Sequence, residues 1–412
     1  MPASSHIKFV LATFLLGTAG LNAVLFWMAR RRVIEGYPDF TIFYAAGLIV
    51  RRGQAAELYD DQLQWQTERE FAQVARTKAG QLPYNHPPFE VLAFLPLTYV
   101  SYLRAYGLWL LVNLLLLAGI LRALGPPLPV LFSIPWLPYL AAFGFFPVAV
   151  ALMQGQDSIL LLSLYVLVFL ALQSGKDFWG GMLLGLGLFK FQLVLPFALI
   201  LLIGRRWRAV GGMLVTGIGV GALSLALVGW NELLYYPHFV WQVNAQAAKR
   251  VIAPGNMPNL RGLIGGWNGG TAAPLWVNAM ILAASVLALA WAAGRWHASA
   301  REHRQSWRSG FSLALVVTFL VSYHGYSQDM SILLLPLLLL VDQLLSGRVV
   351  DRGWGYDLEI CLLLMFFSPV YMVLALHYQH LNLFALVLLA LARSLEGWTK
   401  ASERLDTLSA AP

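Results

Sequence analysis

Charged residues and cysteine are both scarce in this sequence. Asp, Glu, Lys and Arg together make up 12% of the 412 residues, against about 25% in typical soluble chains. So few charges cannot cover the surface of a protein of this size in water, which excludes a soluble globular protein. The one cysteine, Cys361, lies in an apolar run, and a single cysteine excludes any disulfide within the chain.

Motifs for soluble nucleotide or hydrolase chemistry are missing as well. No Walker loop, GxSxG elbow, HExxH helix or dinucleotide fingerprint occurs in a suitable context. His377 and His380 have the spacing of zinc ligands, but no third ligand lies near them in the sequence. We therefore expect neither a metal nor a cofactor.

Apolar residues are correspondingly abundant, at 59% of the chain. Runs such as Leu160 to Leu172 are almost continuously apolar and lack the alternation of a barrel strand. Lipid must therefore be the solvent for many side chains, and the spans must be helices. The pattern predicts an all-α fold: one integral membrane domain over residues 1–412, a polytopic bundle of about 11–13 transmembrane helices.

The net charge of +8 reflects arginines clustered beside the apolar spans. This is the positive-inside pattern, so we interpret it as orientation in a lipid bilayer and expect no nucleic acid partner. The basic segments predicted to face the cytoplasm are Gly204–Arg208, Arg295–Arg308, Arg348–Arg352 and the tail after Arg393.

Counting spans from these basic segments predicts which connections face the other side. They are Trp230–Pro274 (a long external loop), Tyr323–Met330 and His377–His380. Residues 30–88 form a further external loop, in which the polar stretch Gln54–Lys78 predicts helices at the membrane interface. Arg30, Arg31 and Arg32 oppose this orientation, although the charge rule is weak beside long loops.

Lys190 interrupts the apolar stretch from Trp179 to Ile203. Basic segments flank the stretch on both sides, so it must hold two short helices hinged near Lys190. A lysine at the bilayer centre costs about 2.5–3.5 kcal/mol on insertion scales, which also favours a hinge. The ammonium group either pairs with a buried carboxylate or snorkels to the interface, or it binds a phosphodiester.

Asp39 lies where the chain should leave the bilayer, among Tyr37, Phe40, Phe43 and Tyr44. Aspartate is a favoured N-cap, and a short helix beginning after it would explain the residue without any function. An apolar setting, however, also tunes a carboxylate toward the range useful for a general base.

Further polar residues fall on the same predicted face. His324 and Asp329 lie in one outer connection, and Gln156 precedes Asp157 in another. Asp157 is an N-cap candidate, and a loop histidine is often only a surface residue. Arg261, in the long external loop, could contact a phosphate or lipid headgroups.

Several short segments, in this order along the chain, resemble glycosyltransferase family 87, whose members are integral membrane transferases of the GT-C type. The matching segments are Asp39-Phe40, Tyr44, Gly53, Tyr59-Asp60, Tyr84–Pro88, Gly155-Gln156, Gly185–Lys190, Arg205–Trp207, Asn259–Gly262, His324 and Asp329. The chain departs from the family pattern at Asp157, where Asn is usual, and at Phe191, where Pro is usual.

The resemblance implies a hexosyltransferase of the plasma (inner) membrane whose active site faces the extracytoplasmic side. Its donor would be a polyprenyl-phosphate sugar, typically mannose, and its acceptor a hydroxyl of a glycolipid or glycan, with inversion. Asp39 would be the general base, and His324 would assist it or hold the acceptor.

Lys190 and Arg261 would then bind the donor phosphate. The substrate-binding residues would be Tyr44, Gln156, Asn259 and Asp329. Two alternatives stay open at this point, namely a lipid or sugar transporter or flippase, and an oligosaccharide ligase or polymerase with a diphosphate-linked donor.

Overall fold

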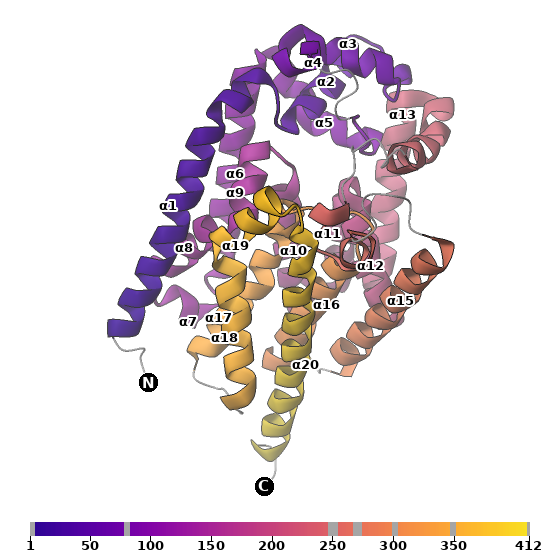
Figure 1. Ribbon diagram of the computed structural model, residues 1–412. Helices are drawn as coiled ribbons and strands as arrows, with labels where there is room; N and C mark the ends of the chain where they lie inside the picture. Colours follow the sequence, from indigo (N-terminus) through magenta and orange to yellow (C-terminus); the bar gives the residue numbers. More distant parts are fainter. Residues whose placement is uncertain are drawn as a thin grey trace.

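The computed structural model describes residues 5–77, 83–245, 254–266, 274–298, 304–346 and 352–409, and within these ranges the chain is helical without a strand. Figure 1 shows an elongated bundle with smaller helices across one end. The α-helices are α1 (Ser5–Glu35), α2 (Phe40–Arg51), α3 (Asp61–Phe71), α4 (Gln73–Thr77), α5 (Val91–Phe94), α6 (Tyr102–Leu124), α7 (Pro129–Phe132), α8 (Leu137–Gly144), α9 (Phe146–Gln154), α10 (Ser158–Gln173), α11 (Asp177–Leu186), α12 (Phe191–Ile203), α13 (Trp207–Ala245), α14 (Leu260–Gly265), α15 (Leu275–Ala298), α16 (Arg304–Val321), α17 (Leu334–Leu345), α18 (Arg352–Phe366), α19 (Ser368–Met372) and α20 (Phe384–Ser409).

Short helices of other types join several of these elements. Val373–His377 is a π-helix, and the rest are 3-10 helices. The 3-10 helices are Ala55–Glu57, Pro88–Glu90, Leu95–Tyr99, Gly187–Lys190, Pro254–Asn256, Asp329–Leu333 and Leu381–Leu383.

The predicted polytopic helical bundle is confirmed. Six helical segments of the described chain are long and apolar enough to cross a membrane, and eight if each of two sharply bent pairs is one span. This is fewer than the 11–13 expected, because helices such as α10 and α16 are apolar but shorter than a full span. Both are buried on most sides, as helices at the centre of a bundle are.

The smaller helices at one end form a helical cap, which we define as residues 40–77 and 83–99 (Figure 1). Helix α2 anchors it, with every residue from Phe40 to Ile49 buried. Aromatic rings hold the cap together, and Phe43 stacks on Phe94 at 4.4 Å between ring centroids. The predicted interfacial stretch Gln54–Lys78 contains α3 and α4, and its last residue, Lys78, lies outside the described ranges.

Helices α11 and α12 form a hairpin that turns at Gly187–Lys190. Helix α11 packs along the start of α13, where a Cβ on Gly181 or Gly212 would lie within 2.0 Å of a backbone oxygen of the other helix. Helix α12 ends just before α13 begins, so the start of α11 and the end of α12 lie at the same end of the bundle. The break falls at Lys190, as the sequence predicts.

Helix α13 continues into the predicted external loop Trp230–Pro274. Gly229 has φ 80° and ψ 175°, which kinks the helix, and the chain then remains helical to Ala245. The first third of the predicted loop Trp230–Pro274 is therefore helical. Within the rest of it, residues 246–253 and 267–273 lie outside the described ranges.

Both termini lie at the end of the bundle opposite the helical cap (Figure 1). The arginines that opposed the predicted orientation lie at the cap end. Part of their charge is balanced there, since Arg31 pairs with Glu35 at 2.9 Å.

Candidate active site

Five separate parts of the chain bring polar side chains together where the helical cap meets the bundle. They are the turn before α2, the segment that leads into α5, the turn between α9 and α10, the tip of the α11–α12 hairpin, and the 3-10 helix Asp329–Leu333 that precedes α17. Their polar residues are Asp39, His86, Glu90, Gln156, Asp157, Lys190 and Asp329.

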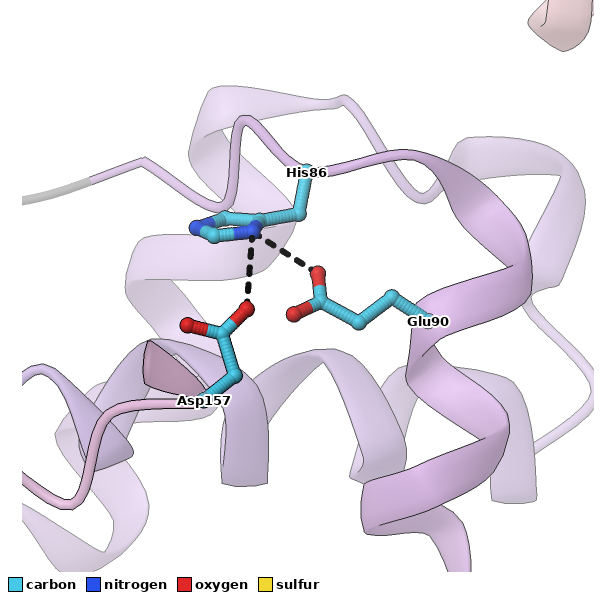
Figure 2. A group of neighbouring side chains, drawn as sticks. All are labelled: His86, Glu90 and Asp157. Atoms are coloured by element: carbon cyan, nitrogen blue, oxygen red, sulfur yellow. Dashed lines mark ion pairs between the residues drawn. The ribbon is translucent and has the colours of Figure 1, made fainter. Parts of the chain in front are cut away.

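His86, Glu90 and Asp157 form a group at this junction that the sequence did not predict (Figure 2). His86 Nδ1 lies 2.8 Å from Glu90 Oε2 and 3.9 Å from Asp157 Oδ2. The motif Tyr84–Pro88 and the N-cap candidate Asp157 were the available signals, but nothing in their spacing predicts that they meet.

The pKa values of the two carboxyl groups are shifted in opposite directions. Burial raises the pKa of Glu90 well above its usual value, and the neighbouring Asp157 adds to the effect. Burial also raises the pKa of Asp157, but its contacts with Lys190, Glu90 and His86 lower it by more. The pKa of Asp157 therefore lies below its usual value. Asp157 holds the N-cap position of α10 but makes no side-chain cap hydrogen bond, so capping does not account for its carboxylate.

Lys190 is the centre of the polar network. Its side chain is 3% exposed, and Nζ lies 2.9 Å from Asp157 Oδ1 and 2.5 Å from Asp329 Oδ1. It also donates to Ser158 Oγ at 2.9 Å and to Gln156 Oε1 at 3.2 Å. Of the alternatives drawn from the sequence, pairing with buried carboxylates is therefore present in the structure.

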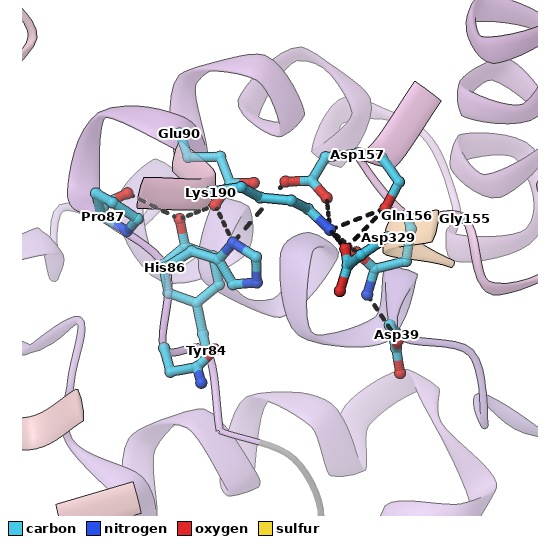
Figure 3. A network of polar contacts seen from close by, with 12 residues as sticks. Asp39, Tyr84, His86, Pro87, Glu90, Gly155, Gln156, Asp157, Lys190 and Asp329 are labelled. Atoms are coloured by element: carbon cyan, nitrogen blue, oxygen red, sulfur yellow. Dashed lines mark hydrogen bonds and ion pairs between the residues drawn. The ribbon is translucent and has the colours of Figure 1, made fainter. Parts of the chain in front are cut away.

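Gln156 links this network to Asp39 (Figure 3). Its amide donates to Asp39 Oδ2 at 2.6 Å while its carbonyl oxygen accepts from Lys190. Gly155 makes the link possible, because it has φ 60° and a Cβ there would lie 2.8 Å from the Cβ of Phe40. Only glycine combines that backbone conformation with so close an approach to α2.

Asp39 is only partly buried, whereas Phe40, Phe43 and Tyr44 are buried. It stands directly before α2, yet its side chain makes no cap hydrogen bond. Asp39 therefore holds the N-cap position of α2, but capping does not account for its carboxylate. One carboxylate oxygen is held by Gln156, which leaves the other oxygen available for a different contact.

A cavity of about 270 Å³ lies beside the network. His86, Gln156, Lys190, His324 and Asp329 all contribute to its wall, together with rings such as Trp241 and Tyr323. Burial lowers the pKa of His324 to about 4, so its ring is neutral near pH 7. Asp39 does not line the cavity itself and lies behind Gln156.

The remaining predicted site residues, Arg261, Asn259 and Tyr44, do not line the cavity. Arg261 stacks on Tyr323 at 3.9 Å from the ring centroid and donates to its carbonyl oxygen at 2.9 Å. Asn259 is buried and caps α14 by accepting from Gly262 N. Tyr44 is buried in the helical cap and donates to Val100 O.

Among the described residues, the one group that brings three possible metal ligands together is His86, Glu90 and Asp157. His377 and His380, whose spacing resembles that of zinc ligands, are not part of it.

Comparison with family models gives a match to glycosyltransferase family 87 over residues 84–322, which is more than half of the chain. The matched region contains His86, Gln156, Lys190 and Arg261 but not Asp39. Comparison with curated proteins and with solved structures gives no match.

Proposed function

This chain belongs to glycosyltransferase family 87 and is thus a membrane glycosyltransferase, and from this premise we propose that it uses a polyprenyl-phosphate sugar, most simply mannose. The acceptor is a hydroxyl group of a glycolipid or glycan. The reaction takes place at the junction of the helical cap and the bundle, on the extracytoplasmic face of the plasma membrane.

The observation that carries this proposal is the line of contacts from Asp39 through Gln156 to Lys190. It joins a partly accessible carboxylate to a cavity wall that carries a cation. Glycosyl transfer needs these two functions, a base for the acceptor and a positive charge for the leaving group, within one site.

In the proposed reaction, the acceptor oxygen forms a bond to the anomeric carbon of the donor sugar. The bond between that carbon and the phosphate oxygen breaks, and polyprenyl phosphate leaves with the electron pair. The acceptor proton passes to the free oxygen of Asp39. Attack from the side opposite the phosphate inverts the configuration. His324, neutral at the cavity wall, accepts or donates a hydrogen bond to hold the acceptor.

The leaving phosphate requires positive charge that Lys190 alone supplies poorly. Its ammonium group already faces Asp157 and Asp329, so its charge is balanced before any substrate binds. Arg261, stacked over Tyr323 beside the cavity, is the second cation that we assign to the phosphate. A guanidinium group presents a planar fork of donors that matches phosphate geometry.

The other predicted substrate-binding residues divide into two kinds. Gln156 and Asp329 line the cavity and can reach a sugar hydroxyl. Tyr44 and Asn259 are buried and already hydrogen-bonded. We assign to these two a supporting role, in which they hold the helical cap and α14 in place around the cavity.

The size of the cavity favours a single sugar over an oligosaccharide. Ligand pockets usually measure about 300–1,000 Å³, and this cavity lies just below that range. A ligase or polymerase that binds an oligosaccharide on a diphosphate carrier needs more room. A transporter agrees with the helix break at Lys190, but the family is one of transferases.

The test is a transfer assay with purified protein in lipid nanodiscs. Radiolabelled polyprenyl-phosphate mannose is supplied with a membrane glycolipid fraction as acceptor. Labelled product with release of polyprenyl phosphate supports the proposal. Transfer from a diphosphate-linked oligosaccharide but not from the monophosphate donor would overturn it, as would passage of the donor across the bilayer without transfer.

A further inference from the structure

The group of His86, Glu90 and Asp157 has no role in the reaction described above. Its ligand atoms, one from each side chain, all lie within 4.8 Å of one another. The Glu90 side chain is 3% exposed and that of Asp157 is 1% exposed. Figure 2 shows both carboxylates turned toward the same imidazole nitrogen.

The atoms of this group are satisfied mainly by one another. In the described part of the chain, Glu90 Oε1 has no donor, His86 Nδ1 faces the Glu90 carboxyl at 2.8 Å, and Asp157 is held by Glu90 and by its ion pair with Lys190. Buried polar atoms are normally satisfied. Two carboxylates and an imidazole nitrogen that face one another need a shared proton or a bound cation between them.

The surroundings of the imidazole favour a cation. The backbone of Phe189 is a further polar partner of the His86 ring, and Nδ1 is the nitrogen that faces the carboxylates. Metal-ligating histidines almost always hydrogen-bond through their second nitrogen, which fixes the ring and its tautomer. Glu90 is held similarly, because Tyr84 donates to its Oε2 at 3.3 Å.

The buried charges around this group also favour a bound cation. Asp157 and Asp329 are two buried acids paired with one buried cation, Lys190, and the buried Glu90 lies beside Asp157 across His86. Buried charges require partners. A divalent cation between His86, Glu90 and Asp157 would balance the excess and leave more of the Lys190 charge free for a ligand.

We propose that His86, Glu90 and Asp157 bind a divalent first-row metal ion, Mn²⁺ or Zn²⁺, behind the part of the cavity wall that His86 forms. One imidazole with two carboxylates is a mixed nitrogen and oxygen donor set that suits these ions. The proposal replaces the expectation of no metal drawn from the sequence. It adds to the proposed function, on which its second part rests: the ion adds positive charge on the side of the cavity where the donor phosphate binds.

The experiment measures metal binding directly. Purified protein in nanodiscs is stripped with EDTA, dialysed against Mn²⁺ or Zn²⁺, and its metal content is determined by mass spectrometry. We expect about one ion per chain. Glu90→Gln and Asp157→Asn should each weaken binding at least about tenfold, since even second-shell changes cost 10–100-fold.

Two control variants isolate the group. Asp329→Asn removes a carboxylate from Lys190 but leaves the three ligands intact, so it should keep the metal. Glu68→Gln changes a buried carboxylate in α3 and should also keep it. Folding of every variant is followed by size-exclusion chromatography, and His86→Ala provides a further ligand variant if Asp157→Asn does not fold.

Absence of stoichiometric binding by folded wild-type protein at millimolar Mn²⁺ and Zn²⁺ would overturn the proposal and leave a carboxyl pair that shares a proton. Equal binding by wild type and Glu90→Gln would overturn it as well. These results do not depend on transfer activity, so metal binding without transfer would contradict only the proposed function. Transfer without metal binding would contradict only this inference.

Discussion

The side-chain amide of Gln156 donates a 2.6 Å hydrogen bond to the carboxylate of Asp39, across 117 positions of sequence. This bond fixes one carboxylate oxygen and sets the direction of the other. It also makes Asp39 the end of a line of contacts that begins at the buried Lys190. The predictions below start from this pair.

Replacement of Asp39 by asparagine should abolish transfer without unfolding the protein. The amide keeps an oxygen that can accept from Gln156, but it cannot take the acceptor proton, and loss of a general base costs about 10²–10⁴ in rate. The measurement is turnover with a purified lipid-linked donor. Asp61→Asn, which changes an exposed carboxylate of the helical cap, should retain wild-type activity. Near-normal turnover by Asp39→Asn would show that the base is another residue.

Replacement of Gln156 by alanine should lower kcat about 10- to 100-fold. Hydrogen bonds to charged groups contribute about 1.5–3 kcal/mol, and each 1.36 kcal/mol changes a rate tenfold. Gln154→Ala is the matched control, since Gln154 reaches only the backbone nitrogen of Asp39 and at 3.4 Å. Steady-state kinetics in nanodiscs separate kcat from KM. Equal losses in the two variants would argue against a special role for Gln156.

Replacement of Lys190 by methionine should destabilise the protein by about 3–5 kcal/mol, because removal of one partner leaves buried carboxylates uncompensated. Thermal unfolding in nanodiscs measures the effect. The double variant Lys190→Met with Asp329→Asn should recover part of the loss, since it removes one of the two stranded charges. A double variant less stable than Lys190→Met would mean that Asp329 is stabilised independently of Lys190.

Glu68 should make stability depend on pH. Burial raises its pKa from 4.5 to about 8, so the folded state favours the protonated form. Its contribution is present in full below the unfolded pKa and is lost as pH rises from about 4.5 to 8. By pH 7 the loss amounts to as much as about 3 kcal/mol.

The comparison of Glu68→Gln with wild type checks this dependence. At pH 5 the two proteins should unfold at similar temperatures, and at pH 8 the variant should be the more stable. Glu57→Gln, at an exposed position of the same cap, should follow the wild-type curve. A Glu68→Gln variant that is less stable than wild type at pH 8 would indicate an ionised partner for this carboxylate.

The sequence was sufficient for the features that depend on hydropathy. Apolar runs predict the helical bundle, and the cost of a charge in lipid predicts the break at Lys190. The kink at Gly229 also falls where the apolar span was expected to end. Each of these follows from local composition, because helical hydrogen bonds join residues only four apart.

The partners of the polar residues could not be predicted in this way. Asp39 and Asp157 both precede helices, so N-capping was the local expectation for each. Packing instead places Gln156 against Asp39 and Lys190 against Asp157. The meeting of His86 with Asp157 depends on how the helical cap lies over α10, and no spacing within the chain encodes that arrangement.

The α11–α12 hairpin also determines how far Lys190 lies from the membrane surface. Ten residues of α-helix and four of 3-10 helix lift Lys190 about 20 Å from Asp177. A hydrocarbon core is about 30 Å thick. In the orientation proposed above, which puts Asp177 at the inner membrane surface, Lys190 and the cavity that it lines lie below the outer surface, under the helical cap. A sugar that reaches it has left bulk water behind, and donor hydrolysis then competes poorly with transfer.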